Sequence, residues 1–143
     1  MHKKIHKLAM PSRIDKIEKA AFFVEKALKN LKYDPDDRDN VVIAATEAIT
    51  NAIIHGNKND PNKKVQITVE GRNDRIVIHV KDEGKGFKPN KLQNPLSPEN
   101  LMRENGRGIL ILKSLMDHVS FDFSPTGTEI IITKFISESK TDE

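Results

Sequence analysis

The chain has 143 residues, of which 36% are hydrophobic and 31% charged, a balance typical of one folded globular domain rather than of a disordered or fibrous protein. It contains no cysteine, which excludes disulfide bonds and thiolate metal sites, and no apolar run is long enough to cross a membrane, so we expect a cytoplasmic protein without a membrane partner. The net charge of +3 comes from scattered basic residues interleaved with acids, which favours a solvated surface over direct binding of nucleic acid.

The beginning of the chain predicts a short strand and a helix. Residues 5–10 form an apolar-containing segment that ends at Pro11 and reads as an edge strand. A helix is expected over residues 12–30, with Ser12 as its N-cap and Asp15 completing a partial capping box. Its buried stripe is predicted from the apolar residues at helical spacing, which are Ile14, Ile17, Ala21, Val24 and Leu28.

The second expected helix is mostly aliphatic but carries polar residues four positions apart. It is capped by Asp34 and runs to about Gly56, where the sequence HGNKNDPN supplies turn signals. Within TEAITNAIIHGNKND, Glu47 and Asn51 project into one space, and His55 sits a further step round the helix.

The polar pair on this helix has two interpretations. A carboxylate beside the apolar sequence VVIAAT costs desolvation energy unless a partner or a task holds it. Glu47 could serve as a general base, and the neutral carbonyl of Asn51 suits a hard cation such as Mg²⁺. The simpler interpretation is that both side chains reach solvent at the helix edge, and this motif alone leaves the two interpretations balanced.

After the second helix, the period of the apolar residues changes from helical to two. Residues 64–70 and 75–81 alternate around the turn GRND, which predicts a hairpin with one buried face. Residues 88–105 are polar and proline-rich with no clear period, so we expect a functional or mobile loop there. The remaining expected elements are a helix over 106–119, a second hairpin over 119–135 and a charged tail over 137–143.

The order of these elements predicts the fold class. Strands joined by tight turns pair with their sequence neighbours, and the apolar stripes of the helices must cover the buried face of the sheet. We therefore expect a single α+β domain over residues 1–143, a two-layer sandwich in which a mixed, mostly antiparallel sheet is covered on one face by helices.

Two glycine-containing motifs suggest a ligand. The sequence DEGKGF follows the second strand, where Asp82 could accept a hydrogen bond from an amino group such as that of adenine, while Gly84 and Gly86 would let the backbone approach the ligand. The sequence NGRGILIL places Gly106 and Gly108 at a helix start, where free N–H groups and the helix dipole favour a phosphate. Taken alone, DEGKGF is better explained as an ordinary glycine-rich turn.

The order of the motifs is more specific than any one of them. Glu-x-x-x-Asn on a helix, Asp-x-Gly-x-Gly after a strand, a long polar loop, Gly-x-Gly at a helix start and Gly-Thr in the last hairpin resembles the GHKL ATP-binding superfamily and its Bergerat fold. The resemblance extends from about residue 12 to residue 135. The sequences EAITNAIIHGN and GRGILIL look most like the small bacterial anti-sigma factor serine kinases.

The resemblance implies that the chain binds ATP with Mg²⁺. By it, Glu47 would be the general base, Asn51 the Mg²⁺ ligand and His55 a supporting residue, and residues 88–105 would form a lid. Asp82 would bind the adenine amino group. The other nucleotide contacts would be Gly84 and Gly86 beneath the nucleotide, Gly106, Arg107 and Gly108 at the phosphates, and Thr128 near the adenine.

The implied function is that of an ATP-dependent serine-protein kinase. It would phosphorylate an anti-sigma factor antagonist, sequester a sigma factor and act as a homodimer. A nucleotide-gated partner switch with little or no catalysis is the alternative, and a basic nucleic-acid-binding domain is a more distant one. A histidine kinase core acting alone is disfavoured, because the chain has no room for the helical domain that carries a phosphoacceptor histidine.

Overall fold

The computed structural model describes residues 4–29, 31, 34–84 and 107–136. The predicted lid over 88–105 and the predicted tail over 137–143 lie outside this part of the chain. The elements in chain order are β1 (Lys4–Pro11), η1 (Ile14–Lys16), α1 (Ile17–Lys29), α2 (Pro35–Asn51), η2 (Ala52–Gly56), β2 (Lys64–Gly71), β3 (Arg75–Lys81), α4 (Arg107–Leu115), β4 (His118–Ser124) and β5 (Gly127–Phe135).

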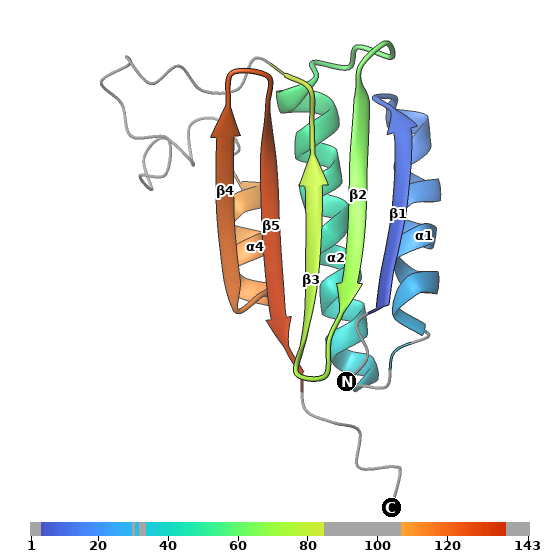
Figure 1. Cartoon of the computed structure of the whole chain (residues 1–143), viewed down its shortest axis with the longest axis vertical. Helices are drawn as coiled ribbons and strands as arrows, with labels where there is room; N and C mark the ends of the chain where they lie inside the picture. The colour runs from blue at the N-terminus through green and yellow to red at the C-terminus, as the bar shows by residue number, and fades with distance from the viewer. Residues whose placement is uncertain (1–3, 30, 32–33, 85–106, 137–143) are drawn as a thin grey trace, which may run out of the picture.

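The described strands form one five-stranded sheet in the order β1-β2-β3-β5-β4. Every pairing between neighbouring strands in this sheet is antiparallel, so the predicted mixed sheet is corrected to a fully antiparallel one within the described residues. Both predicted hairpins are present, and α1, α2 and α4 all lie behind the same face of the sheet (Figure 1). The predicted two-layer α+β sandwich is confirmed.

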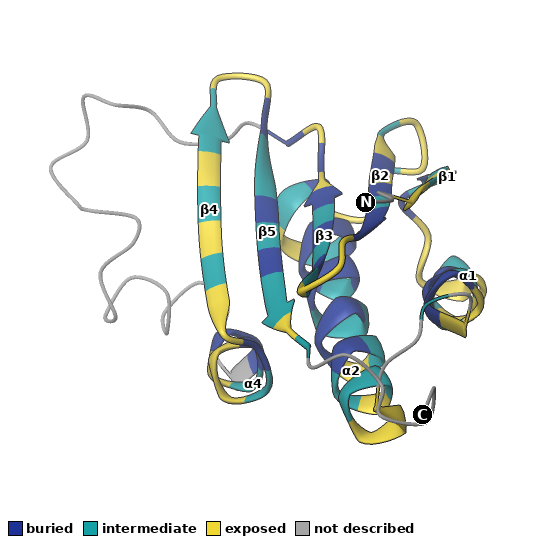
Figure 2. Ribbon diagram, turned by 60° about the horizontal axis from the view of Figure 1, so that its bottom comes forward, coloured by how far each residue is buried: buried dark blue, intermediate teal, exposed yellow. Residues whose placement is uncertain are grey.

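The core lies between the sheet and the helices. Alternate residues of the central strands point toward the helices, where Figure 2 shows the buried positions on the facing sides of both layers. Small residues on α2, such as Ala44 and Ala48, let that helix approach the sheet closely. The largest fully buried side chains include Leu28, Ile49, Ile53, Ile67, Ile76, Ile78, Ile109, Leu112 and Ile132.

The beginning of α1 differs from the prediction. Ser12 is not its N-cap, because the Ser12 hydroxyl is fully buried and donates a hydrogen bond to the carbonyl of Lys63 at 2.7 Å. The short 3₁₀ turn η1 precedes the α-helix and has fewer residues per turn, so the buried stripe shifts from its predicted positions. Ile14 is 59% exposed, and the buried face of α1 is formed by Ala20, Val24, Ala27 and Leu28.

The second helix begins as predicted but ends in a different geometry. The Asp34 carboxylate accepts a hydrogen bond from the backbone N–H of Asp36 at 2.8 Å, which confirms its capping role. After Asn51 the chain continues as the π-helix η2, in which the N–H of Asn57 donates to the carbonyl of Ala52 at 2.8 Å. This wider turn changes the register of the residues that follow, and His55 is exposed.

The last helix is shorter than predicted. α4 ends at Leu115, and β4 already begins at His118, so the predicted helix over 106–119 is wrong at its C-terminal end. Asp117 joins the two elements to β5: its N–H donates to the carbonyl of Thr133, and its carboxylate accepts from the N–H of Phe135. None of the helices in the described residues is long and apolar enough to cross a membrane.

Candidate functional site

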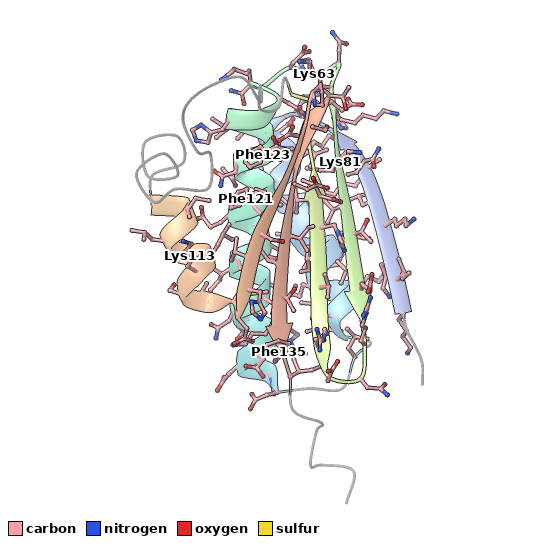
Figure 3. All side chains as sticks on the ribbon, turned by 60° about the vertical axis from the view of Figure 1, so that its left-hand side comes forward. Lys63, Lys81, Lys113, Phe121, Phe123 and Phe135 are labelled. Atoms are coloured by element: carbon pink, nitrogen blue, oxygen red, sulfur yellow. The ribbon has the colours of Figure 1, made fainter. Side chains whose placement is uncertain are left out.

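The candidate site lies at one end of the sheet, where β3 ends, the turn between β4 and β5 begins and η2 finishes. Figure 3 shows Lys63 toward this end of the molecule and Phe135 toward the opposite end. Asp82 follows the last residue of β3 directly, and Thr128 is near the start of β5. The sheet register therefore fixes the place of both residues.

Asp82 is held by the backbone of two separate segments. Its Oδ1 accepts hydrogen bonds from the N–H of Gly84 at 2.9 Å and of Thr128 at 3.0 Å, and its own N–H donates to the carbonyl of Thr128 at 2.9 Å. The side chain is 4% exposed. Burial raises the pKa of the Asp82 carboxyl group, while the two N–H donors and the charge of Lys63 oppose that rise. The result is a carboxylate of fixed orientation in a largely desolvated place.

Three glycines pack directly around Asp82. A β carbon added at Gly56 would overlap the Asp82 carboxylate on its Oδ2 side, and one added at Gly127 would overlap the Asp82 carbonyl oxygen. A β carbon at Gly84 would overlap the carbonyl oxygen of Gly56. Any other residue at these positions would displace the backbone or the carboxylate. The sequence analysis assigns Gly84 to the site, but it includes Gly127 only in the Gly-Thr motif and treats Gly56 only as the end of a helix.

A second group of predicted residues meets where α4 begins. A β carbon added at Gly108 would fall 3.3 Å from Oε2 of Glu47 and 3.5 Å from Nδ2 of Asn51. Asn51 is 7% exposed, and its Nδ2 has no hydrogen-bond partner among the described residues. An unpaired buried amide is costly, so its presence here indicates a place for a further polar group. The first N–H groups of an α-helix have no partner within the helix, so the start of α4 at Arg107 brings possible hydrogen-bond donors to this part of the chain.

The remaining predicted site residues are only partly covered by the structure. Arg107 is the first residue of α4. Gly86, Gly106 and the lid over 88–105 lie outside the described residues. His55, the expected supporting residue, is exposed on η2.

The arrangement has two chemically different ends, joined by η2. At one end Asp82 offers a buried acceptor that is packed closely against glycine backbone. At the other end a carboxylate, an unpaired amide and a helix start converge. An acceptor for an exocyclic amino group at one end and a phosphate-favouring helix start at the other are complementary to a purine nucleotide.

Comparison with known families shows which family the chain belongs to. Residues 10–134 match the family described as histidine kinase-like ATPase domain. The chain belongs to this family. Membership in the histidine kinase-like ATPase family confirms the predicted resemblance and implies that the chain uses ATP.

The relatives of this histidine kinase-like ATPase domain include proteins of similar length. It is 37% identical to the anti-sigma F factor of Oceanobacillus iheyensis over 74% of this chain and 75% of the relative. It is 32% identical to the anti-sigma F factor of Bacillus subtilis over 98% of this chain and 94% of the relative. It is 31% identical to the serine-protein kinase RsbW of Bacillus subtilis over 77% of this chain and 72% of the relative.

Solved structures show the same fold. A crystal structure of the RsbU and RsbW domains of a Mycobacterium tuberculosis protein superposes with a TM-score of 0.65 at 16% identity, over 95% of this chain and 34% of that longer one. The catalytic domain of histidine kinase ThkA superposes with a TM-score of 0.51 at 14% identity, over 97% of this chain and 100% of that one. At these identities the likeness concerns the fold alone.

Proposed function

We propose that this chain is an ATP-dependent serine-protein kinase that phosphorylates an anti-sigma factor antagonist and also sequesters a sigma factor. The relatives named anti-sigma F factor and serine-protein kinase RsbW support this function. The structural observation that carries the proposal is the pair of clusters at the two ends of η2, one built on Asp82 and the other on Glu47, Asn51 and Gly108.

The Asp82 end suits adenine. The Oδ1 atom is occupied by two backbone N–H donors, which leaves Oδ2 as the atom that would accept a hydrogen bond from the exocyclic amino group. Because the carboxylate is fixed before the ligand arrives, binding would cost little side-chain entropy. Gly56 and Gly84 pack beside the carboxylate with backbone atoms alone, because a β carbon at either position would overlap a neighbouring atom. Thr128 would contribute through its backbone, which positions Asp82.

The Gly108 end suits the phosphates and a magnesium ion. Asn51 carries a buried amide with an unpaired nitrogen, and a flip of the amide plane would instead present its oxygen as a ligand for a hard cation. Asn51 would hold Mg²⁺ beside the phosphates, where the ion would supply neutralisation of their negative charge. The described residues contain no cluster of three or more His, Asp or Glu side chains that could hold a metal ion, so phosphate oxygens would have to supply part of the coordination.

Glu47 would act as the general base. It lies on α2 one turn before Asn51, and its Oε2 reaches the same space beside Gly108. The serine hydroxyl of the protein substrate would lose its proton to Glu47 while its oxygen forms the new bond to the γ-phosphorus and the bond to the bridging oxygen of ADP breaks. The N–H groups at the start of α4 would stabilise negative charge on the transferred phosphoryl group.

The proposed partners follow from the relatives' names. An anti-sigma factor antagonist would be the phosphorylated protein, and a sigma factor would be the sequestered one. We further propose a homodimer, because α1, α2 and α4 cover only one face of the sheet (Figure 1). Apolar and partly exposed residues such as Val77 and Ile131 lie on the other face. Location in the cytoplasm stays a prediction.

Phosphate transfer to a co-encoded candidate antagonist tests the proposed function. The purified chain, radiolabelled ATP and Mg²⁺ should label the antagonist on serine, and Glu47→Gln should abolish most of the labelling without loss of nucleotide binding. Tight nucleotide binding with no labelling of the antagonist would instead identify a nucleotide-gated partner switch. Sedimentation of the unmodified chain would test the homodimer, which a purely monomeric species at micromolar concentration would contradict.

A further inference from the structure

A buried asparagine outside the predicted site is the centre of a hydrogen-bond network beside it. Asn57 is 1% exposed and follows η2 directly. Its Oδ1 accepts from the N–H of Glu83 at 2.7 Å, while its Nδ2 donates to the Ser12 hydroxyl at 2.6 Å and to the carbonyl of Lys64 at 3.0 Å. One side chain therefore connects the end of η2, the end of β3, the start of β2 and the segment before η1.

The orientation of this amide is determined by its neighbours. A flipped amide would place Nδ2 against the N–H of Glu83 and Oδ1 against the carbonyl of Lys64, so both contacts would become repulsive. Ser12 completes the arrangement, because its hydroxyl accepts from Asn57 and donates to the carbonyl of Lys63 at 2.7 Å. Every polar atom of the Asn57 side chain is used, and buried networks of this kind hold a single geometry.

The bond to Glu83 restrains the residue that follows Asp82. The N–H of Glu83 belongs to the same short segment in which Gly84 donates to the Asp82 carboxylate. On the opposite side, the carboxylate of Glu83 accepts from the N–H of Lys64 at 2.6 Å. Asn57 also succeeds Gly56, the glycine that lies against the Asp82 carboxylate. The backbone on both sides of the proposed adenine acceptor is thus tied to Asn57.

We propose that Asn57 is a positioning residue for nucleobase selection, which sets Asp82 at the place where it can distinguish an exocyclic amino group from an oxygen. This inference rests on the proposed function, in which Asp82 binds the adenine amino group. Asn57 would touch neither the nucleotide nor the transferred phosphoryl group. Its loss would weaken recognition of the base, while Glu47 and Asn51 on α2 would keep their places.

A residue with a purely structural role would behave differently. Loss of stability would lower the fraction of folded protein and would affect the apparent affinity for every nucleotide in equal proportion. A positioning role would reduce the affinity for ADP more than that for inosine diphosphate, which has an oxygen in place of the amino group. The ratio of the two dissociation constants therefore separates the two roles.

The experiment measures ADP and inosine diphosphate binding by calorimetry, with Mg²⁺, for the unmodified chain and three variants. Asn57→Ala removes all three bonds of the amide, and Ser12→Ala removes only the hydroxyl that accepts from Asn57. Asn62→Ala is the matched control, because Asn62 is an exposed asparagine in the same connection. Thermal unfolding establishes that each variant is folded at the temperature of the titration.

We expect Asn57→Ala to lower the ratio of the dissociation constant for inosine diphosphate to that for ADP by roughly tenfold, which is the effect of one misplaced buried hydrogen bond. Ser12→Ala should narrow it less, Asn62→Ala should leave it unchanged, and phosphate transfer at saturating ATP should persist in all three. An unchanged preference in folded Asn57→Ala would overturn the inference, and Ser12→Ala decides in the same way if Asn57→Ala does not fold. An unmodified chain without any preference for ADP would instead refute the adenine assignment itself, before any variant is compared.

Discussion

Replacement of Asp82 by asparagine isolates the proposed contact with adenine, because the two oxygens of this carboxylate have different surroundings. Oδ1 accepts from the N–H groups of Gly84 and Thr128, so the amide oxygen of Asp82→Asn should take that place and keep both bonds. The amide nitrogen is then forced to the Oδ2 side, next to Gly56. A hydrogen-bond donor would face the amino group of adenine, which is also a donor.

The magnitude follows from the loss of one hydrogen bond to an ionised acceptor. Such a bond contributes about 1.5–3 kcal/mol, so the affinity for ADP should fall roughly 10- to 150-fold. The free energy of unfolding should be unchanged or higher, because burial disfavours the charge of Asp82 and the amide carries none. Affinity and stability would thus move in different directions.

Calorimetry with ADP and inosine diphosphate, together with thermal unfolding, measures both effects. Inosine has a 6-oxo acceptor that matches the amide nitrogen, so Asp82→Asn should lose or reverse the preference for ADP. The reasoning would be refuted by a folded Asp82→Asn protein that binds ADP as tightly as the unmodified chain. A variant that fails to fold would contradict the bonding pattern inferred for its amide oxygen.

Three further predictions follow from the same geometry. Gly108→Ala should preserve or raise the melting temperature, because alanine favours a helix more than glycine does. It should weaken ATP binding about tenfold, because the added methyl group would lie 3.3 Å from Oε2 of Glu47. Titration with ATP and thermal unfolding of one sample measure both effects. Glu47→Gln should keep ADP affinity within error and slow phosphate transfer by a factor on the order of 10²–10⁴, and transfer at the unmodified rate would show that Glu47 is not the base. The raised pKa of Asp82 means that protonation of this carboxyl group stabilises the folded unmodified chain, so any stability advantage of Asp82→Asn at pH 7 should shrink as the pH falls through that raised pKa toward the ordinary value of 3.8. Urea unfolding across this range would contradict the claim if the advantage of Asp82→Asn grew.

Much of the fold could be predicted because its signals are local. The alternation in residues 64–70 and 75–81 specifies strands with one buried face, and the structure shows Ile67 and Ile78 buried there. Asp34 before Pro35 is an N-cap that depends only on its own helix. The motif residues Glu47, Asn51 and Gly108 are brought together as the resemblance implied, since helix spacing and the helix start place them. Their catalytic and binding roles stay predictions.

The errors concern residues whose partners are distant in the sequence. Ser12 has the sequence of an N-cap, but its hydroxyl bonds to Lys63, fifty-one positions away. Asn57 also has a distant partner: its position in the sequence indicates a turn, but its side-chain oxygen accepts a hydrogen bond from the N–H of Glu83. Gly127 belongs to the Gly-Thr motif of the last hairpin, and only the packing of Asp82 against it shows why a side chain is excluded there. Long-range polar contacts leave no periodic trace in a sequence.

The π-turn at η2 has a consequence for protein engineering and for aligning relatives. An i to i+5 hydrogen bond accommodates one residue more than an α-helical turn does, so the helix upstream and the residues downstream follow different angular registers. Deletion of a single residue between Ala52 and Gly56 would allow a regular α-helix to form with Asn57 near its present angular position relative to Asn51, because the wide turn accommodates that one extra residue. Insertion of one further residue would instead rotate Asn57 by about 100° and put the two proposed ends of the nucleotide site out of phase. Insertions in this one turn should therefore be far less tolerated than insertions in the exposed connection around Asn62.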